Sequence, residues 1–229
     1  MTVSPGLRRS LRTGLGALGL SLTLLSGCFD TDRGPSPRPR EFYYPTGLVT
    51  SPGGRSLFVA NSDFDLQYRA GTVQAIDLER LRGLVARLQP PAADGGPGTG
   101  QVRCEALGLA TNDASDSILY PGACAPIDLD APPDGQGTLV RNSVNIGAFA
   151  TDIQVMRQPD TAFPGEQGEA GGPNADGSTR ARLLLPVRGD PSLTWIDIDD
   201  DTGGNQTFQM ACGQGTSGRC DDAHRTGVD

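Results

Sequence analysis

Three short apolar segments lie within Pro45–Leu78, which reads PTGLVTSPGGRSLFVANSDFDLQYRAGTVQAIDL. Gly47–Thr50 and Ser56–Asn61 are separated by Ser51–Gly54, where proline fixes φ and glycine permits a positive φ, so this spacer predicts a tight turn. Gly71–Leu78 follows a polar loop and alternates apolar with polar residues, as a strand with one buried face does. The stretch therefore predicts three consecutive β-strands.

The same order of segments recurs in the second half of the chain, after large insertions. Val73–Leu78 lines up with Leu193–Ile198, and both alternate in the same way. The further strands predicted from this repeat are Ser143–Ile146, Ala150–Val155, Ala181–Val187 and Ser192–Ile198. Such short strands, punctuated by some of the 32 Gly and 18 Pro residues of the chain, predict an all-β fold.

The stretch PTGLVTSPGGRSLFVAN, followed by GTVQAIDL, resembles a blade of the YVTN-type β-propeller family. That family repeats a Ser-Pro-Asp-Gly turn, an apolar strand ending in asparagine, and a later segment that begins Gly-Thr. The first copy has Gly53 where the family usually has aspartate, and the second has Pro186 in the strand and Arg188 in place of asparagine. The resemblance implies β-propeller blades, whereas a generic β-sandwich is the alternative.

A propeller blade cannot bury both of its faces alone and needs neighbours, typically four to eight in a ring. The chain has segments for about two blades, and a third is expected to begin near Thr207–Met210. We therefore expect an incomplete ring. Residues 41–229 are predicted to be a propeller-like domain, truncated at its C-terminus and belonging to a larger protein.

One insertion has a helical pattern. Asp77–Gln89 begins with a residue suited to an N-cap, and its apolar residues recur at helical spacing. Those residues are Leu81, Leu84, Val85 and Leu88. We expect one short helix packed on the propeller rim, whereas Pro90–Gly100 and Pro164–Ser178 are Gly/Pro-rich and predict loops.

The first 27 residues have the form of a secretory signal. Three arginines and no acid precede Gly14–Leu25, an apolar run of twelve residues. Such a run spans about 18 Å as a helix, which is too short for a hydrocarbon core of about 30 Å. Residues 1–27 are therefore predicted to be a signal peptide.

Leu25-Ser26-Gly27-Cys28 resembles the lipobox of bacterial lipoproteins. The resemblance implies that the Cys28 thiol receives a diacylglycerol and that the chain is cut before Cys28. Phe29 follows the cysteine, so the aspartate that can retain lipoproteins in the inner membrane is absent and the outer membrane is favoured. Residues 28–40, which include the Pro-rich Thr31–Arg40, are expected to be a flexible tether.

The five cysteines fit this interpretation. If Cys28 carries lipid, four remain, and they allow three disulfide pairings. We favour the two local pairs, Cys104–Cys124 and Cys212–Cys220, because each closes a short loop. A zinc site is disfavoured, because the chain has no C-x-x-C motif and only one histidine, His224.

The charge of the chain excludes two classes of partner. The formal net charge is −8, and all 19 basic residues are arginine. Such a surface repels nucleic acid and cannot bind anionic lipid through a basic patch. Any membrane link must therefore be covalent or inserted, and the predicted link is the lipid anchor.

Two motifs suggest chemistry but have simpler explanations. The acidic run Asp197–Gly203 could attract calcium, but the spacing of an EF-hand loop would require glycine at Thr202 and glutamate at Phe208. Arg188-Gly189-Asp190 resembles integrin-binding loops, yet it lies between two predicted strands and predicts a turn. No catalytic, cofactor-binding or metal-binding residue is predicted.

The possible ligand-rim loop follows the second strand and contains Asn61, Asp63 and Asp65. In propellers, such loops surround the channel mouth where ligands bind. We therefore expect a cell-envelope lipoprotein whose propeller is a binding scaffold for an envelope protein or a small ligand. The alternatives are a propeller-class enzyme, such as a lactonase-like hydrolase or a quinoprotein-like oxidoreductase, and a purely structural envelope component.

Overall fold

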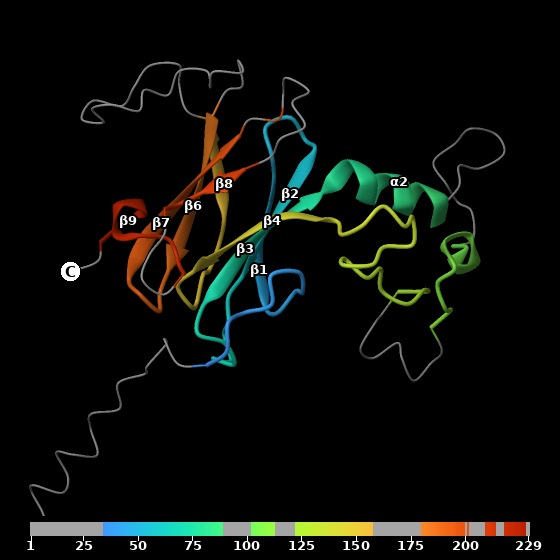
Figure 1. Ribbon diagram of the computed structural model, residues 1–229, viewed down its shortest axis with the longest axis horizontal. Coiled ribbons are helices and arrows are strands. Elements are labelled where there is room, and N and C mark those ends of the chain that lie inside the picture. The colour runs from blue at the N-terminus through green and yellow to red at the C-terminus, as the bar shows by residue number, and fades with distance from the viewer. Residues whose placement is uncertain are drawn as a thin grey trace, which may run out of the picture. The chain divides into compact units, whose positions relative to one another are not determined.

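Two antiparallel β-sheets and one α-helix are the main elements of the structure, a computed structural model (Figure 1). The described residues are 34–88, 102–112, 122–157, 180–199, 201, 209–213 and 218–227. The predicted signal peptide and the predicted lipid-attachment residue Cys28 lie outside them. The content of secondary structure confirms the all-β prediction.

The first sheet contains four strands in chain order. They are β1 (Pro45–Thr50), β2 (Ser56–Asn61), β3 (Gly71–Asp77) and β4 (Val140–Ile146). The first three are the strands that the opening stretch predicts. The predicted turn between β1 and β2 is closed by Gly54, whose amide donates to the Ser51 carbonyl at 2.9 Å and whose φ is +71°.

The second sheet repeats this arrangement. It contains β5 (Gln154–Arg157), β6 (Arg180–Val187), β7 (Ser192–Asp199) and β8 (Met210–Ala211), and the short β9 (Arg225–Thr226) also pairs with β7. We expected a third blade to begin near Thr207–Met210. This expectation is wrong for Met210, which belongs to the second sheet. Met210 pairs with Ile198 of β7 and is buried, so it completes the second sheet.

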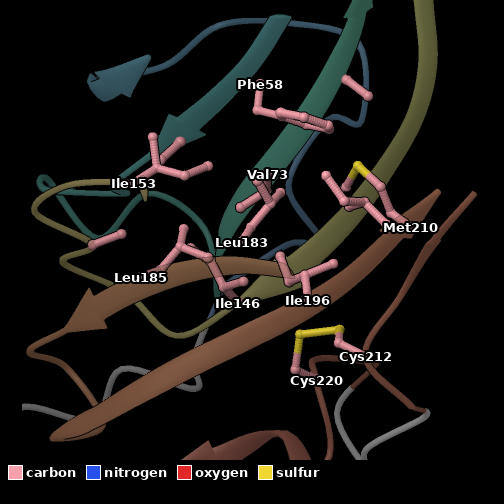
Figure 2. Packing of buried hydrophobic residues seen from close by; sticks show 14 of the residues in the cluster. Phe58, Val73, Ile146, Ile153, Leu183, Leu185, Ile196, Met210, Cys212 and Cys220 are labelled. Carbon is pink, nitrogen blue, oxygen red and sulfur yellow. A yellow bond between two sulfur atoms is a disulfide. The ribbon is translucent and has the colours of Figure 1, made fainter. Parts of the chain in front are cut away.

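The two sheets pack face to face around one apolar core, which Figure 2 shows. Phe58 and Val73 of the first sheet and Leu183 and Ile196 of the second are all fully buried there. Along the sheets, β1 contacts β5 and β4 contacts β8. The sheets are therefore stacked in the same strand order.

The insertion after β3 covers part of the other face of the first sheet (Figure 1). It begins with α2 (Leu78–Leu88), and the Asp77 carboxylate accepts from the Arg80 amide at 3.0 Å, which confirms the predicted N-cap. Leu84 packs with Val59 of β2 in a second apolar cluster. None of the helices in the described ranges is long and apolar enough to cross a membrane.

Both predicted disulfides are confirmed. Cys104, in the 3₁₀ helix Cys104–Leu107, is bonded to Cys124, and Cys212 is bonded to Cys220. The first bond closes the insertion, and the second lies at the edge of the core between the sheets (Figure 2). The first therefore joins two segments of the insertion, and the second ties the segment before β9 to the end of β8.

The described part of the predicted tether, residues 34–40, contacts the sheet domain. The Arg69 amide donates to the Pro35 carbonyl at 3.1 Å, and Pro37 is buried. Arg40 forms an exposed ion pair with Asp130 at 2.6 Å. The segment before β1 is thus placed against the β2–β3 loop.

Candidate ligand-binding site at the loop end of the sheets

Four connections meet at one end of the stacked sheets, which we call the loop end. They are the segment that enters β1, the β2–β3 loop, the β4–β5 connection and the β6–β7 turn. A chain of backbone hydrogen bonds joins them: the Ser62 amide donates to the Tyr44 carbonyl at 3.0 Å, Phe149 to Ser62 at 2.6 Å, and Arg188 to Phe149 at 3.2 Å. The loops are therefore held together as one unit.

A cavity of about 600 Å³ opens at the loop end. This volume lies in the range typical of small-molecule sites. Its lining combines apolar side chains, hydroxyl groups and one cation, and comprises Thr46, Ser62, Phe64, Phe149, Ala150, Thr151 and Arg188. A second cavity, of about 330 Å³ beside the Cys212–Cys220 disulfide, has no aromatic residue in its lining.

Three aromatic side chains, which we call the aromatic rim, gather beside the larger cavity. They are Tyr44, Phe64 and Phe149. The ring centroids of Phe64 and Phe149 are 5.8 Å apart with the rings edge to face, and those of Tyr44 and Phe64 are 6.3 Å apart. Phe64 is 65% exposed and Tyr44 52% exposed, which is unusual for such large apolar groups.

The backbone at the loop end is held in an unfavourable conformation. Tyr44 has φ +46° and Phe149 has φ +61°, and the β2–β3 loop adds Asp63 at +51° and Leu66 at +55°. In the described chain, these are the only non-glycine residues with positive φ. Each costs about 1–3 kcal/mol, and such strain clusters at binding sites. Here it sets the direction in which the side chains of Tyr44 and Phe149 leave the backbone.

Arg188 is the cation of the cavity. Its side chain is exposed, and it makes no ion pair or side-chain hydrogen bond with the described residues. Other arginines are neutralised: Arg80 pairs with Asp134 at 2.9 Å and Arg141 with Asp77 at 2.9 Å. Arg188 therefore gives the cavity a positive charge on a chain whose formal net charge is −8.

The rest of the Arg188-Gly189-Asp190 motif has a structural role. Asp190 accepts from the Arg225 guanidinium at 2.6 Å. A Cβ atom at Gly189 would lie 2.7 Å from the Ala148 carbonyl oxygen, so this position requires glycine. The motif is thus the predicted turn, and it packs against the β4–β5 connection.

The residues of the predicted ligand-rim loop have different environments. Asn61 is fully buried and donates to Thr72 Oγ1 at 3.0 Å, while Asp63 is fully buried and accepts from the Tyr68 amide at 3.0 Å. Asp65 is exposed and accepts from the Gln67 amide. Asn61 and Asp63 thus shape the loop, whereas their neighbours Ser62 and Phe64 line the cavity.

Sequence reasoning missed the aromatic rim. Phe64 could have been noticed as a large apolar residue within a polar loop. Phe149 and Arg188 come from the second half of the chain, and no local pattern connects them with Phe64. Only the stacking of the sheets brings them together.

Burial raises the pKa of the Asp63 carboxyl to about 6. The negative charge of Asp65 adds to this increase, while the hydrogen bond from the Tyr68 amide opposes it. Because the folded pKa lies above the ordinary value of 3.8, protonation of Asp63 stabilises the fold. That contribution is fully present below about pH 3.8 and is lost as the pH rises through about 6.

Asp63→Asn should therefore stabilise the protein at pH 8, by about 1–3 kcal/mol, and change its stability little at pH 4. Asparagine keeps the shape of the side chain and tolerates a positive φ. Urea unfolding at the two pH values measures the effect. The matched variant Asp65→Asn, at an exposed position, should show no such pH dependence; a pH-independent effect of Asp63→Asn would contradict this account.

The acidic run at the end of β7 is part of the structure at the opposite end of the sheets. Asp197 pairs with Arg182 at 2.8 Å. Asp201 is only 4% exposed and accepts from the Gly53 amide at 2.6 Å and the Arg55 amide at 3.0 Å. The run therefore anchors the β1–β2 turn. Within the described ranges, no group of three or more histidine, cysteine or acidic residues could hold a metal ion.

Both ring nitrogens of His224 lie near carboxylate oxygens. Its Nδ1 lies 2.6 Å from Asp221 Oδ1, and its Nε2 lies 3.9 Å from Asp197 Oδ2. The hydrogen bond with His224 lowers the pKa of Asp221. These contacts fasten the short segment before β9 to the second sheet.

The chain matches no protein-family model, and the search of curated proteins found no match either.

Proposed function

We propose that this chain is an exported, cell-envelope lipoprotein, anchored through Cys28 and favouring the outer membrane, whose sheets are blades of a β-propeller. The propeller acts as a binding scaffold, and binding takes place at the loop end. The observation that carries the binding proposal is the cavity with its aromatic rim and the Arg188 charge.

The strand connections support the assignment of blades. Each sheet follows chain order, and β4 leads directly across to β5, so that β1 lies against β5 and β4 against β8. The Greek-key connections of most β-sandwiches return the chain between sheets instead. Stacking of like strands is what neighbouring blades of a ring require.

The outer face of the second sheet supports a further neighbour. Along β6 and β7, residues that face the core alternate with residues on the opposite face of the sheet. Several residues on that opposite face are also apolar. They include Leu184 and Trp195, which are paired across β6 and β7, and Leu193, which is 39% exposed. A further sheet packed there would bury this face, as the next blade of a propeller does.

The cysteines support export. The two disulfides use four of the five cysteines and leave Cys28 as the remaining one. Disulfides form and persist in oxidising compartments outside the cytoplasm. Cys28 stands at the end of the lipobox-like motif, where a lipid-bearing cysteine is expected.

Metabolic labelling with an alkyne analogue of palmitate tests the anchor. Cells that express the full chain should incorporate the label into the protein and retain it in the membrane fraction, because several acyl chains hold a protein firmly. The Cys28→Ser variant should be unlabelled. Absence of label from the wild-type chain, or equal labelling of Cys28→Ser, would contradict the proposal.

A further inference from the structure

We propose that the cavity at the loop end binds a small amphipathic carboxylate, with its apolar body on the aromatic rim and its charged group on Arg188. This inference rests on the proposed binding function and specifies its ligand.

The apolar part of the site is built for a flat or flexible hydrocarbon group. Phe64 and Phe149 meet edge to face at 5.8 Å, and Ala150 continues the apolar lining. Phe64 keeps 65% of its surface exposed, although burial of an aromatic side chain is strongly favourable. A ligand group placed on these rings would remove that surface from water.

The charged part of the site selects an anion. The Arg188 guanidinium makes no ion pair or hydrogen bond with the described residues, and a guanidinium binds a carboxylate through two parallel hydrogen bonds. Two other arginines of the second half are engaged, because Arg225 and Arg219 lie 2.6 and 3.8 Å from the Asp190 carboxylate. One available guanidinium supplies one positive charge, which a singly charged carboxylate neutralises.

The site is formed before a ligand arrives. The hydrogen-bond chain from Tyr44 through Ser62 and Phe149 to Arg188 links every segment that contributes to it. The positive φ of Tyr44 and Phe149 fixes the direction of two rim side chains. A site that needs no ordering on binding retains more of its interaction energy as affinity.

The test measures binding of 2-naphthoate to the full chain in detergent, by calorimetry against a detergent blank that accounts for partitioning into micelles. The uncharged 2-naphthamide and 2-naphthyl phosphate serve as matched probes. We expect 2-naphthoate to bind at least about ten-fold more tightly than 2-naphthamide, and no less tightly than the phosphate.

Variants locate the site. Arg188→Gln should weaken 2-naphthoate binding at least about ten-fold, and Phe64→Ala about three- to ten-fold. Both residues are exposed, so the variants should fold. Arg103→Gln removes the same charge from an exposed arginine in the insertion and should change nothing.

Several results would overturn the inference: no binding of 2-naphthoate, equal binding by Arg188→Gln, equal binding of the amide, or tighter binding of the phosphate. These failures are distinct from failure of the proposed function. A chain that incorporates palmitate at Cys28 but does not bind 2-naphthoate remains a lipoprotein scaffold, and only the small carboxylate is excluded.

Discussion

Replacing Phe58 with alanine is expected to lower the free energy of unfolding by about 3–5 kcal/mol. Phe58 is fully buried in β2, in the core that the two sheets share. Truncation removes the apolar contacts with both sheets and leaves a cavity that rigid strands cannot refill. The effect should be among the largest of any single substitution in the chain.

Phe64→Ala is the matched control, because it removes the same atoms from a side chain that is 65% exposed. It should change stability by less than about 1 kcal/mol. Denaturant unfolding, followed by the fluorescence of Trp195, the only tryptophan, measures both variants. Equal destabilisation by the two would mean that Phe58 does not lie in a core between the sheets.

Replacing Asp201 with alanine is expected to cost about 2–4 kcal/mol, because the variant leaves several buried donors without a partner. The Asp201 carboxylate accepts from the amides of Gly53 and Arg55 and, at 2.5 Å, from Ser51 Oγ. It thus links the second half of the chain to the β1–β2 turn. A Cβ atom at position 53 would lie 2.5 Å from Asp201, which explains the glycine there.

A double-mutant cycle separates this link from other effects of the substitution. Ser51→Ala and Asp201→Ala should be coupled by about 0.5–3 kcal/mol, as directly contacting groups are. Asp65→Ala, which removes an exposed carboxylate, should cost less than about 1 kcal/mol. An Asp201→Ala variant as stable as the wild type would refute the anchoring role.

The elements that sequence predicts correctly are those that local patterns define. Alternation defines β3, the Ser51–Gly54 turn separates β1 from β2, and Asp77 begins α2. The local disulfides follow from short spacing. In each case the physical cause lies within a few residues of the element itself.

The features that sequence does not predict depend on contacts between the halves of the chain. The β1–β2 turn lacks the aspartate of the YVTN pattern, and Asp201 from the second half supplies a carboxylate to it. Met210 belongs to the second sheet because it pairs with Ile198 of β7, a contact that no local pattern predicts. The cavity joins Phe64 to Phe149 and Arg188 only after the sheets stack.

Site-specific photo-crosslinking in intact cells tests the central claim that the loop end is the binding end. A benzoylphenylalanine replaces Phe64 at the loop end or, as a control, Val85, which is 44% exposed on α2. Irradiation followed by whole-protein mass spectrometry should show an adduct at position 64, whose mass distinguishes a small ligand from a protein, and none at position 85. Adducts at position 85 alone, or at both positions equally, would contradict the account.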